Sequence, residues 1–117
     1  MKIYVIGIGL IGGSMTLDIK TLHPEAKIYG IDSNESHLQE AIALGVVDAG
    51  ATFEDLVDAD FVIVSVPVDV ALVVLPKVLD VIGENTIVFE VGSTKTPICE
   101  AVAKHPKRRN FIATHPI

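Results

Sequence analysis

The sequence is poor in residues that several classes of protein need. Its 117 residues include one cysteine, no tryptophan, and nine lysines and arginines against fifteen aspartates and glutamates. The single cysteine, Cys99, excludes an internal disulfide and suits a reducing compartment. A net charge of −6 argues against a nucleic-acid partner, because binding to phosphates needs a basic surface. The one basic cluster, residues 104–109, is interrupted by His105 and Pro106. We therefore expect this segment to form a solvated turn.

Long uninterrupted apolar runs are also missing. The longest apolar region, residues 61–75, is broken by Pro67 and Asp69 and is too short to span a bilayer. Lys2 stands before an apolar stretch, as in a signal peptide, but this stretch is rich in glycine and lacks an Ala-x-Ala site. We therefore expect a cytoplasmic protein without a membrane partner. Half of the residues are hydrophobic, enough for one globular domain over residues 1–117.

Three glycines follow the first apolar segment, residues 3–6, in the pattern Gly7-x-Gly9-x-x-Gly12. Each position meets a demand of a dinucleotide-binding turn. Gly7 allows a tight turn off the strand, Gly9 lets the backbone approach a pyrophosphate, and Gly12 lets the next helix pack against the strand. The pattern alone is weak, but a strand before it and a helical pattern after it provide the right context.

The helix predicted over residues 10–19 adds a second reason to expect an anion here. The first turn of a helix has backbone N–H groups without partners and carries the positive end of the helix dipole. Leu10, Ile11 and Gly12 fall in this turn. We therefore predict that their backbone contributes to phosphate binding.

Asp32 ends the second predicted strand, residues 26–31, twenty residues after Gly12. An aspartate here has two interpretations. It caps the helix that begins near Asn34, or it accepts hydrogen bonds from the adenosine ribose hydroxyls. The strand, the glycines and the spacing together favour the second. Because a carboxylate would repel a 2′-phosphate, the pattern favours NAD over NADP.

The rest of the chain continues to alternate between strands and helices. The patterns predict four further strands, over residues 46–49, 60–66, 86–91 and 111–114. Between them they predict a helix over 34–44 ended by Gly45, a short helix over 53–57, and a helix over 69–82 kinked at Pro76 and ended by Gly83. A last helix is predicted from Thr96 and Pro97 to Lys104. Six alternating strands predict an α/β fold of the Rossmann type, a doubly wound parallel sheet in the order 3-2-1-4-5-6 with helices on both faces. Ligands of such sheets bind at the carboxyl ends of the strands, near the first and fourth.

The fourth predicted strand is followed by Ser65, Val66 and Pro67. Their position under the expected cofactor makes them predicted cofactor contacts. Asp69, slightly further on, is better explained as the cap of the following helix.

Polar residues also follow the fifth and sixth predicted strands. The loop after the fifth strand contains Gly92, Ser93, Thr94 and Lys95. Thr96 and Pro97 already serve the next helix start, so this loop has more polar groups than capping needs, although a solvated loop remains an alternative. His115 follows the sixth strand, where a neutral imidazole could accept a proton from a substrate hydroxyl. From position alone, that role and an ordinary terminal histidine remain equally open.

Five segments together resemble the prephenate dehydrogenase family, which includes arogenate dehydrogenases. They are GIGLIGGS at 7–14, the strand end at Asp32, SVPV at 65–68, VGSTK at 91–95 and ATHPI at 113–117. The pairing of Gly-Ser-Thr-Lys with His-Pro-Ile is the specific part, since many dehydrogenases share the glycine turn. The resemblance covers all 117 residues but only the first domain of the family, without its helical C-terminal domain.

The resemblance implies oxidation of prephenate by NAD⁺ with loss of carbon dioxide, giving 4-hydroxyphenylpyruvate on the way to tyrosine. It implies that His115 accepts the proton of the ring hydroxyl, that Ser93 orients this histidine and the substrate, and that no metal takes part. It further implies a homodimer for the full-length enzyme, and a chain that binds NAD but does not turn over prephenate by itself. Glu90 departs from the family pattern, in which aspartate is usual.

Two alternatives remain at this stage. One is a different NAD(P)-dependent dehydrogenase or reductase, such as a β-hydroxyacid type, which would use the same sheet. The other is a non-catalytic NAD(H)-sensing module. Neither would need a histidine at the end of the last strand together with Ser93.

Overall fold

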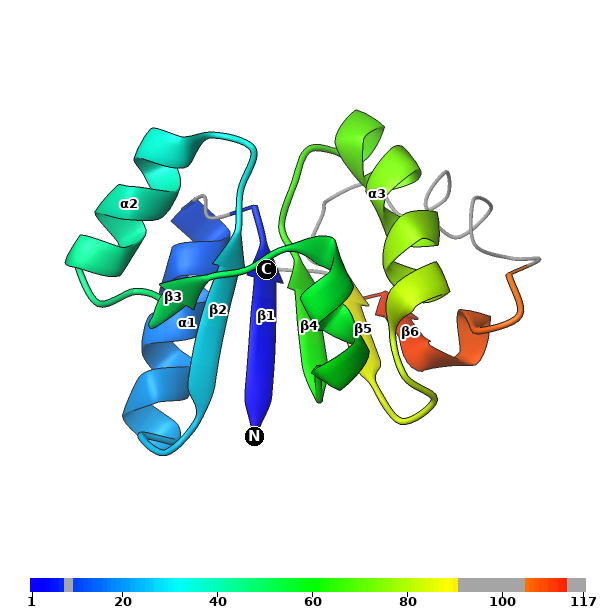
Figure 1. Ribbon diagram of the computed structural model, residues 1–117, viewed down its shortest axis with the longest axis horizontal. Helices are drawn as coiled ribbons and strands as arrows, with labels where there is room; N and C mark the ends of the chain where they lie inside the picture. The colour runs from blue at the N-terminus through cyan, green and yellow to red at the C-terminus, as the bar shows by residue number, and fades with distance from the viewer. Residues whose placement is uncertain (8–9, 91–104, 114–117) are drawn as a thin grey trace.

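The computed structural model describes residues 1–7, 10–90 and 105–113. Within them the elements are β1 (Lys2–Ile6), α1 (Leu10–Leu22), β2 (Lys27–Ile31), α2 (Glu35–Ala43), β3 (Ala49–Gly50), η1 (Phe53–Asp58), β4 (Phe61–Val64), α3 (Val68–Val81), β5 (Ile87–Glu90), η2 (Arg108–Asn110) and β6 (Phe111–Ala113). The helices η1 and η2 are 3₁₀ helices. Figure 1 shows the strands side by side across the molecule.

Six strands of the described chain form one sheet in the order β3-β2-β1-β4-β5-β6, and every pair is parallel. The predicted fold class and strand order are therefore confirmed. The order reverses at β1, whose neighbours are β2 and β4. At this point the connections leave the sheet in opposite directions, so that a crevice is expected at the carboxyl ends of β1 and β4.

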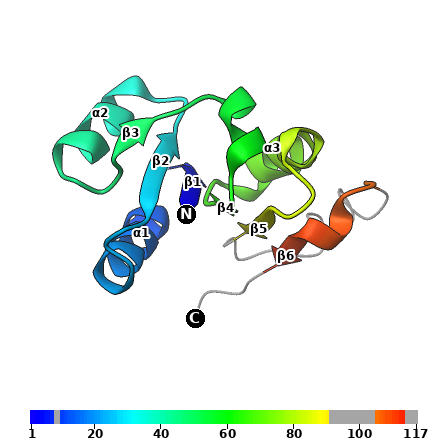
Figure 2. The same cartoon turned by 60° about the horizontal axis from the view of Figure 1, so that its bottom comes forward.

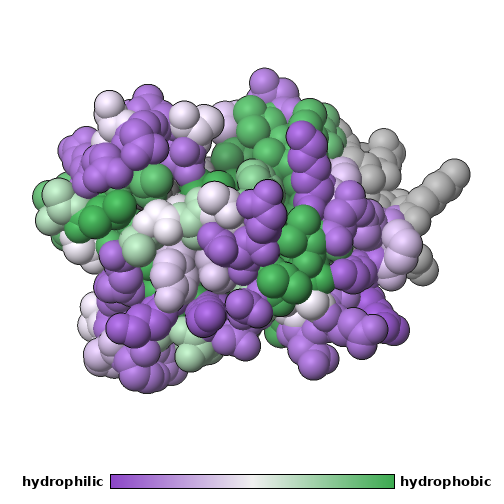
Figure 3. Space-filling model, in the orientation of Figure 1, coloured by the Kyte–Doolittle hydropathy of each residue, from purple (hydrophilic) through white to green (hydrophobic). Residues whose placement is uncertain are grey.

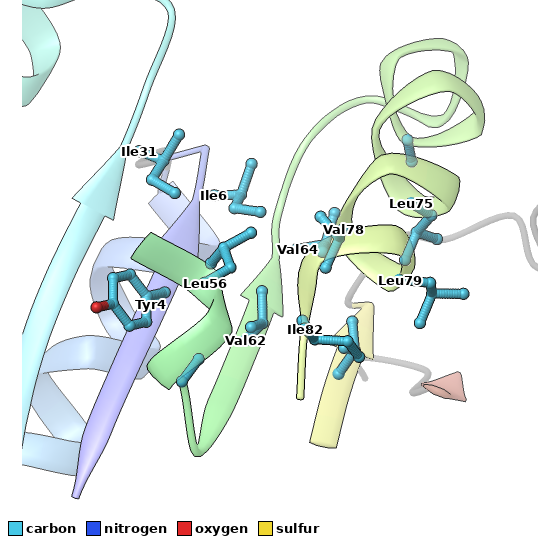
Figure 4. Packing of buried hydrophobic residues seen from close by; sticks show 13 residues of the cluster. Tyr4, Ile6, Ile31, Leu56, Val62, Val64, Leu75, Val78, Leu79 and Ile82 are labelled. Carbon is cyan, nitrogen blue, oxygen red and sulfur yellow. The ribbon is translucent and has the colours of Figure 1, made fainter. Parts of the chain in front are cut away.

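Helices cover the sheet from both sides, as Figures 1 and 2 show by the positions of α1 and α3. One face packs against α3 and η1. The buried residues of α3 recur at helical spacing, with Ala71, Leu75, Val78 and Leu79 all 0% exposed, and they contact strand residues such as Val64 in one cluster. Figure 4 shows this packing. Each fully buried leucine or valine side chain contributes about 1.5–3 kcal/mol.

The other face packs against α1 and α2. Its cluster combines Ile3 and Ile28 of the strands with Leu38 of α2, and Met15 and Ile19 of α1 pack against it. On the outside, Figure 3 shows apolar surface over α3. Val70 and Val73 of that helix are 41% and 58% exposed. None of the helices in the described part of the chain is long and apolar enough to cross a membrane.

The predicted strand over residues 46–49 is wrong, because the third strand is Ala49–Gly50. Gly45 has a φ of +76° and ends α2, as predicted, but the chain then continues through a turn. Both Val46 and Val47 donate their backbone N–H groups to the carbonyl of Ala41, and Val47 is buried without belonging to a strand. The two valines therefore fill the core from a helix C-terminus.

The segment before β6 is fastened to the C-terminal end of α3. The backbone N–H of Lys107 donates to Nδ1 of His105 at 3.0 Å, which leaves the ring hydrogen on Nε2, 2.6 Å from Asp80 Oδ1. The Lys107 ammonium donates to the carbonyl of Ile82, the C-cap residue of α3. The predicted turn is therefore present, but it is tied to the domain, and His105 is only 14% exposed at its side chain.

Candidate active site

Three strands meet through backbone hydrogen bonds at the crevice. The N–H of Gly7, directly after β1, donates to the carbonyl of Ile31 at the end of β2 over 2.8 Å. The N–H of Ser65, directly after β4, donates to the carbonyl of Ile6 at the end of β1, also over 2.8 Å. The end of β1, at Ile6 and Gly7, is thus hydrogen-bonded to the strand on each side.

Gly7 is required here for two independent reasons. Its φ is +83°, a backbone conformation that costs roughly 1–2 kcal/mol with a side chain present. A Cβ atom at this position would also lie 2.3 Å from the carbonyl oxygen of Ser65 and 2.5 Å from Cγ1 of Val66. Gly7 therefore has the left-handed backbone conformation that favours glycine, and it approaches the β4–α3 connection closely.

The helix that follows the turn begins as predicted, at Leu10. Ile11 and Gly12 lie in its first turn, which has no acidic residue. The first turn of an α-helix carries the positive end of the helix dipole and backbone N–H groups without partners inside the helix, and here no acidic side chain competes with an anion for them. Gly9, the middle glycine of the pattern, lies outside the described residues.

Asp32 follows β2 and is partly buried. Its Oδ1 accepts the backbone N–H of Asn34 at 2.8 Å. The N-cap of α2 is Asn34, whose Oδ1 accepts the N–H of His37 at 3.1 Å. Asn34, and not Asp32, is therefore the N-cap of α2. The hydrogen bond from the Asn34 N–H orients the Asp32 carboxylate at the carboxyl end of the sheet.

The connection from β4 to α3 is short. Ser65 and Val66 are partly buried, and Pro67 is exposed at the N-cap position of α3. The predicted cap, Asp69, is wrong, because α3 begins at Val68 and Asp69 lies in its first turn. A carboxylate in this place still interacts favourably with the helix dipole. Proline at the cap leaves no side-chain hydrogen bond there.

The residues predicted on the substrate side lie outside the described part of the chain. They are Gly92, Ser93, Thr94 and Lys95 after β5, and His115 after β6. The predicted helix from Thr96 to Lys104 lies outside it as well. What the structure describes on this side is the end of each strand, at Glu90 and at Ala113, which form a register pair.

No group of three or more histidine, cysteine, aspartate or glutamate side chains in residues 1–7, 10–90 and 105–113 is arranged to hold a metal. An apolar groove of about 390 Å³ lies away from the crevice, beside α1 and over the face of β4 and β5. Met15 and Ile19 of α1 line it together with Phe61 and Phe89, whose rings stack at 6.0 Å.

Among the residues that the structure describes, two side chains have shifted pKa values, and both lie outside the crevice. Burial, with a smaller effect of Asp55, raises the pKa of Tyr4, whose ring stacks on Tyr29 with centroids 5.0 Å apart. A hydrogen bond from Lys20 lowers the pKa of Asp48. Both shifts therefore concern stability.

The doubly wound sheet, the close approach of Gly7 to Ser65 and the first turn of α1 without an acidic residue define the class of this protein as a dinucleotide-binding domain. Residues 15–117 match the family described as prephenate dehydrogenase, nucleotide-binding domain. The chain therefore belongs to the prephenate dehydrogenase family, and the prediction of a nucleotide cofactor is confirmed at this level. The match starts after the glycine turn, so the turn supports the assignment independently.

Known proteins similar to this chain agree with the family. Prephenate dehydrogenase of Bacillus subtilis is 36% identical over 98% of the chain. A structure of prephenate dehydrogenase from Aquifex aeolicus, in complex with hydroxyphenyl propionate and NAD⁺, has a TM-score of 0.89 at 29% identity over 100% of the chain. Synechocystis arogenate dehydrogenase has a TM-score of 0.82 at 28% identity over 99%. The chain spans 32% of the Bacillus protein and 42% and 41% of the two solved chains.

Proposed function

We propose that this chain binds NAD⁺ at the carboxyl edge of its sheet, in a protein that oxidises prephenate to 4-hydroxyphenylpyruvate with loss of carbon dioxide. The observation that carries the proposal is membership of the prephenate dehydrogenase family over residues 15–117. The relative from Aquifex aeolicus was solved with NAD⁺. The cytoplasmic location and the homodimer of the full-length enzyme belong to the same proposal.

The described residues fit a dinucleotide. The space beside Gly7 is so narrow that a methyl group would overlap Ser65, which fits the first glycine of the dinucleotide-binding pattern, where the chain turns off the strand. Gly7, Gly9 and the first turn of α1, Leu10 to Gly12, would hold the pyrophosphate. Asp32 would accept hydrogen bonds from the adenosine ribose hydroxyls. Ser65, Val66 and Pro67 would contact the nicotinamide half of the cofactor.

NAD⁺, when bound, supplies the acceptor for the hydride that leaves the ring carbon bearing the hydroxyl group. His115, as a neutral imidazole, accepts the hydroxyl proton. Ser93 orients the imidazole and the hydroxyl group, with Gly92, Thr94 and Lys95 forming the surrounding loop. The electron pair of the breaking bond to carbon dioxide enters the ring, and the ring oxygen takes the proton back from His115, so that the product is a neutral phenol.

The test of the catalytic residues uses the complete polypeptide that carries this chain. Prephenate and NAD⁺ are supplied, and NADH is followed by its absorbance for wild type, His115→Asn and the control His105→Asn. His105 is bound to Asp80 and the Lys107 backbone, so its substitution should leave turnover intact. We expect a loss of roughly 100-fold or more in His115→Asn. Full activity of that variant would exclude His115 as the proton acceptor.

Arogenate in place of prephenate tests the substrate, because the solved relatives include enzymes for both. Turnover of prephenate well above that of arogenate is the expected result. Preference for arogenate would correct the substrate while keeping the family. No turnover of either would reject the proposed reaction.

A further inference from the structure

The two faces of the sheet are not equally covered at β4 and β5. Val62 of β4 and Val88 of β5, which face α3, are both 0% exposed. Side chains alternate along a strand, so the neighbouring Phe61 and Phe89 point to the opposite face. Both phenylalanines are only partly buried, although each strand has a neighbour on both sides. Strands inside a parallel sheet are normally buried on both faces, so the described chain leaves this side of β4 and β5 incompletely covered.

This side of the two strands forms the apolar groove beside α1. Eight residues line the groove, and all of them except His23 are apolar. Met15 and Ile19 are four residues apart and therefore lie on one face of α1. The stacked rings of Phe61 and Phe89 lie on the sheet side of the groove. The groove is thus bounded by a helix and by the sheet, and its volume of about 390 Å³ has room for a few side chains.

The chemistry of the groove does not suit a small-molecule site. Such sites combine an apolar lining with a few polar groups that fix the orientation of the ligand. Here His23 is the only polar residue among the eight that line the groove, and it is exposed. A lining of this kind favours apolar side chains, as in grooves that take the apolar face of an amphipathic helix.

The size of the groove does not suit a stable contact between two separate copies of the chain. A stable interface uses about 20–30 residues from each partner, and only eight line the groove. A segment that is covalently linked to the domain needs fewer contacts, because the link keeps it at a high effective concentration. The groove therefore favours a segment of the same polypeptide.

The connections between neighbouring strands leave this side of the sheet free. α3 joins β4 to β5 across the opposite face (Figure 2), and right-handed connections that continue in the same direction across the sheet use that face as well. On the groove side, α1 and α2 pack against residues of β1, β2 and β4. A cover for Phe89 must therefore come from elsewhere in the polypeptide.

The relatives indicate how much polypeptide there is to provide this cover. The chain spans only 32% of the Bacillus subtilis protein and 42% of the solved Aquifex aeolicus chain. β6 is the last strand described, and it pairs with β5 at Phe89. Polypeptide that continues from β6 therefore starts one strand away from the groove.

We propose that an amphipathic helix of the complete polypeptide, following residue 117, packs in this groove beside α1. A helix is the expected occupant because helices cover the faces of parallel sheets, and it would continue the layer formed by α2 and α1. The contact fastens the rest of the polypeptide to the nucleotide-binding domain away from the crevice. The inference rests on the greater length of the family members and not on the proposed reaction, so that a failure of prephenate turnover does not decide it.

The first test compares side-chain accessibility in the 117-residue chain and in the complete polypeptide. Hydroxyl-radical oxidation, measured by mass spectrometry, labels exposed methionine, phenylalanine and leucine side chains. We expect the labelling of Met15 and Phe89 to fall by roughly tenfold in the complete polypeptide, as a covering helix opens only rarely. Leu17, which is 51% exposed on α1 and two residues from both Met15 and Ile19, points away from the groove and should keep its labelling. Equal labelling of Met15 and Phe89 in the two proteins would show an open groove and overturn the proposal.

The second test identifies what occupies the groove. The photoreactive residue p-benzoylphenylalanine is placed in the complete polypeptide at Met15 or at Ile19, with Leu17 as the control position. We expect the probes at Met15 and Ile19 to cross-link to residues beyond 117 of the same polypeptide, in a product of monomer mass, and the probe at Leu17 not to do so. The two groove positions are about 6 Å apart along α1. A helix packed alongside should therefore be cross-linked at sites about three or four residues apart.

The other cross-linking results would overturn the proposal. A product of twice the monomer mass would make the groove a contact between two copies. A cross-link to a partner within residues 1–117 would mean that this chain covers its own groove. Sites about two residues apart would indicate an extended segment and reject the helix, because a strand rises about 3.3 Å per residue. No cross-link from either groove position would show that nothing packs there.

Discussion

Gly7 and Ser65 approach so closely that a methyl group on Gly7 would lie 2.3 Å from the Ser65 carbonyl oxygen. Gly45 provides the matched contrast. It has a similar φ of +76° against +83° for Gly7, but nothing lies within 4 Å of its would-be Cβ atom. The two glycines thus separate backbone strain from close approach.

Replacing each glycine by alanine should therefore give different results. Gly45→Ala should lose about 1–2 kcal/mol of stability from backbone strain alone. Gly7→Ala should lose about 1–3 kcal/mol more through overlap with the β4–α3 connection, and its affinity for NAD⁺ should fall. Urea denaturation and calorimetric NAD⁺ titration measure both effects. Equal stability of the two variants, with NAD⁺ binding retained in Gly7→Ala, would contradict the role of the turn.

Asp32→Ala should weaken NAD⁺ binding by roughly tenfold or more, because hydrogen bonds to a charged acceptor contribute about 1.5–3 kcal/mol. The affinity for NADP⁺ should rise relative to NAD⁺ as the carboxylate is removed. Asn34→Ala is the control. It removes the cap of α2 at a cost of about 1 kcal/mol but keeps the backbone N–H that Asp32 accepts. Tighter binding of NADP⁺ than NAD⁺ in wild type would reject this account of Asp32.

The Asp48 carboxyl group should make the free energy of unfolding depend on pH in the acidic range. Its Oδ1 accepts from the Lys20 ammonium at 2.7 Å and its Oδ2 from the Ile28 N–H at 2.8 Å, and the Lys20 hydrogen bond is the main cause that lowers the pKa of Asp48 from 3.8. A carboxyl group with a lower pKa in the folded state stabilises the protein above its unfolded pKa and loses this contribution as the pH falls through the folded pKa.

Urea denaturation between pH 6 and about pH 3 should therefore show a steeper loss of stability for wild type than for Asp48→Asn. Because Asp48 is 36% exposed at its side chain, the difference should stay below about 1 kcal/mol. Lys20→Met should reduce the pH dependence in the same direction. Parallel pH profiles for all three proteins would show that the pair does not couple folding to protonation.

Asn110→Ala should destabilise the domain without affecting the cofactor site. The Asn110 side chain is buried, and its amide satisfies the carbonyls of Glu84 and Thr86. One buried and one partly buried acceptor without a donor should together cost about 1–3 kcal/mol in the free energy of unfolding. The NAD⁺ affinity of the folded fraction should be unchanged, since this network lies at the amino ends of the strands. A large loss of NAD⁺ affinity in the folded variant would show coupling between the two ends of the sheet.

The sequence was sufficient to predict the sheet order, because apolar strands and helical periodicity alternate without interruption and right-handed crossovers leave few topologies. It failed at Val46 and Val47, where two β-prone residues fill the core from a turn. Tertiary packing overrides strand propensity there. It also failed at Asp69, since proline occupies the cap position of α3, and a proline cap leaves no pattern of polar residues to detect.

The local structure at the candidate site was predictable where a glycine pattern determines it. The start of α1 at Leu10 follows from the pattern, and the close approach of Ser65 explains the glycine at position 7. The cofactor-binding role of these residues remains a prediction. The burial of Glu90 was not predictable, because a charged residue ending a strand reads equally well as a solvent-exposed end. The roles of Ser93 and His115 remain predictions from the family resemblance.

The most direct test of the proposed function is the stoichiometry of the reaction. The complete polypeptide that carries this chain is given prephenate and NAD⁺, and NADH, carbon dioxide and 4-hydroxyphenylpyruvate are quantified together. The account predicts that the three products appear in equal amounts. NADH formed without carbon dioxide, as a simple hydroxyacid dehydrogenase would give, or no NADH at all, would contradict it.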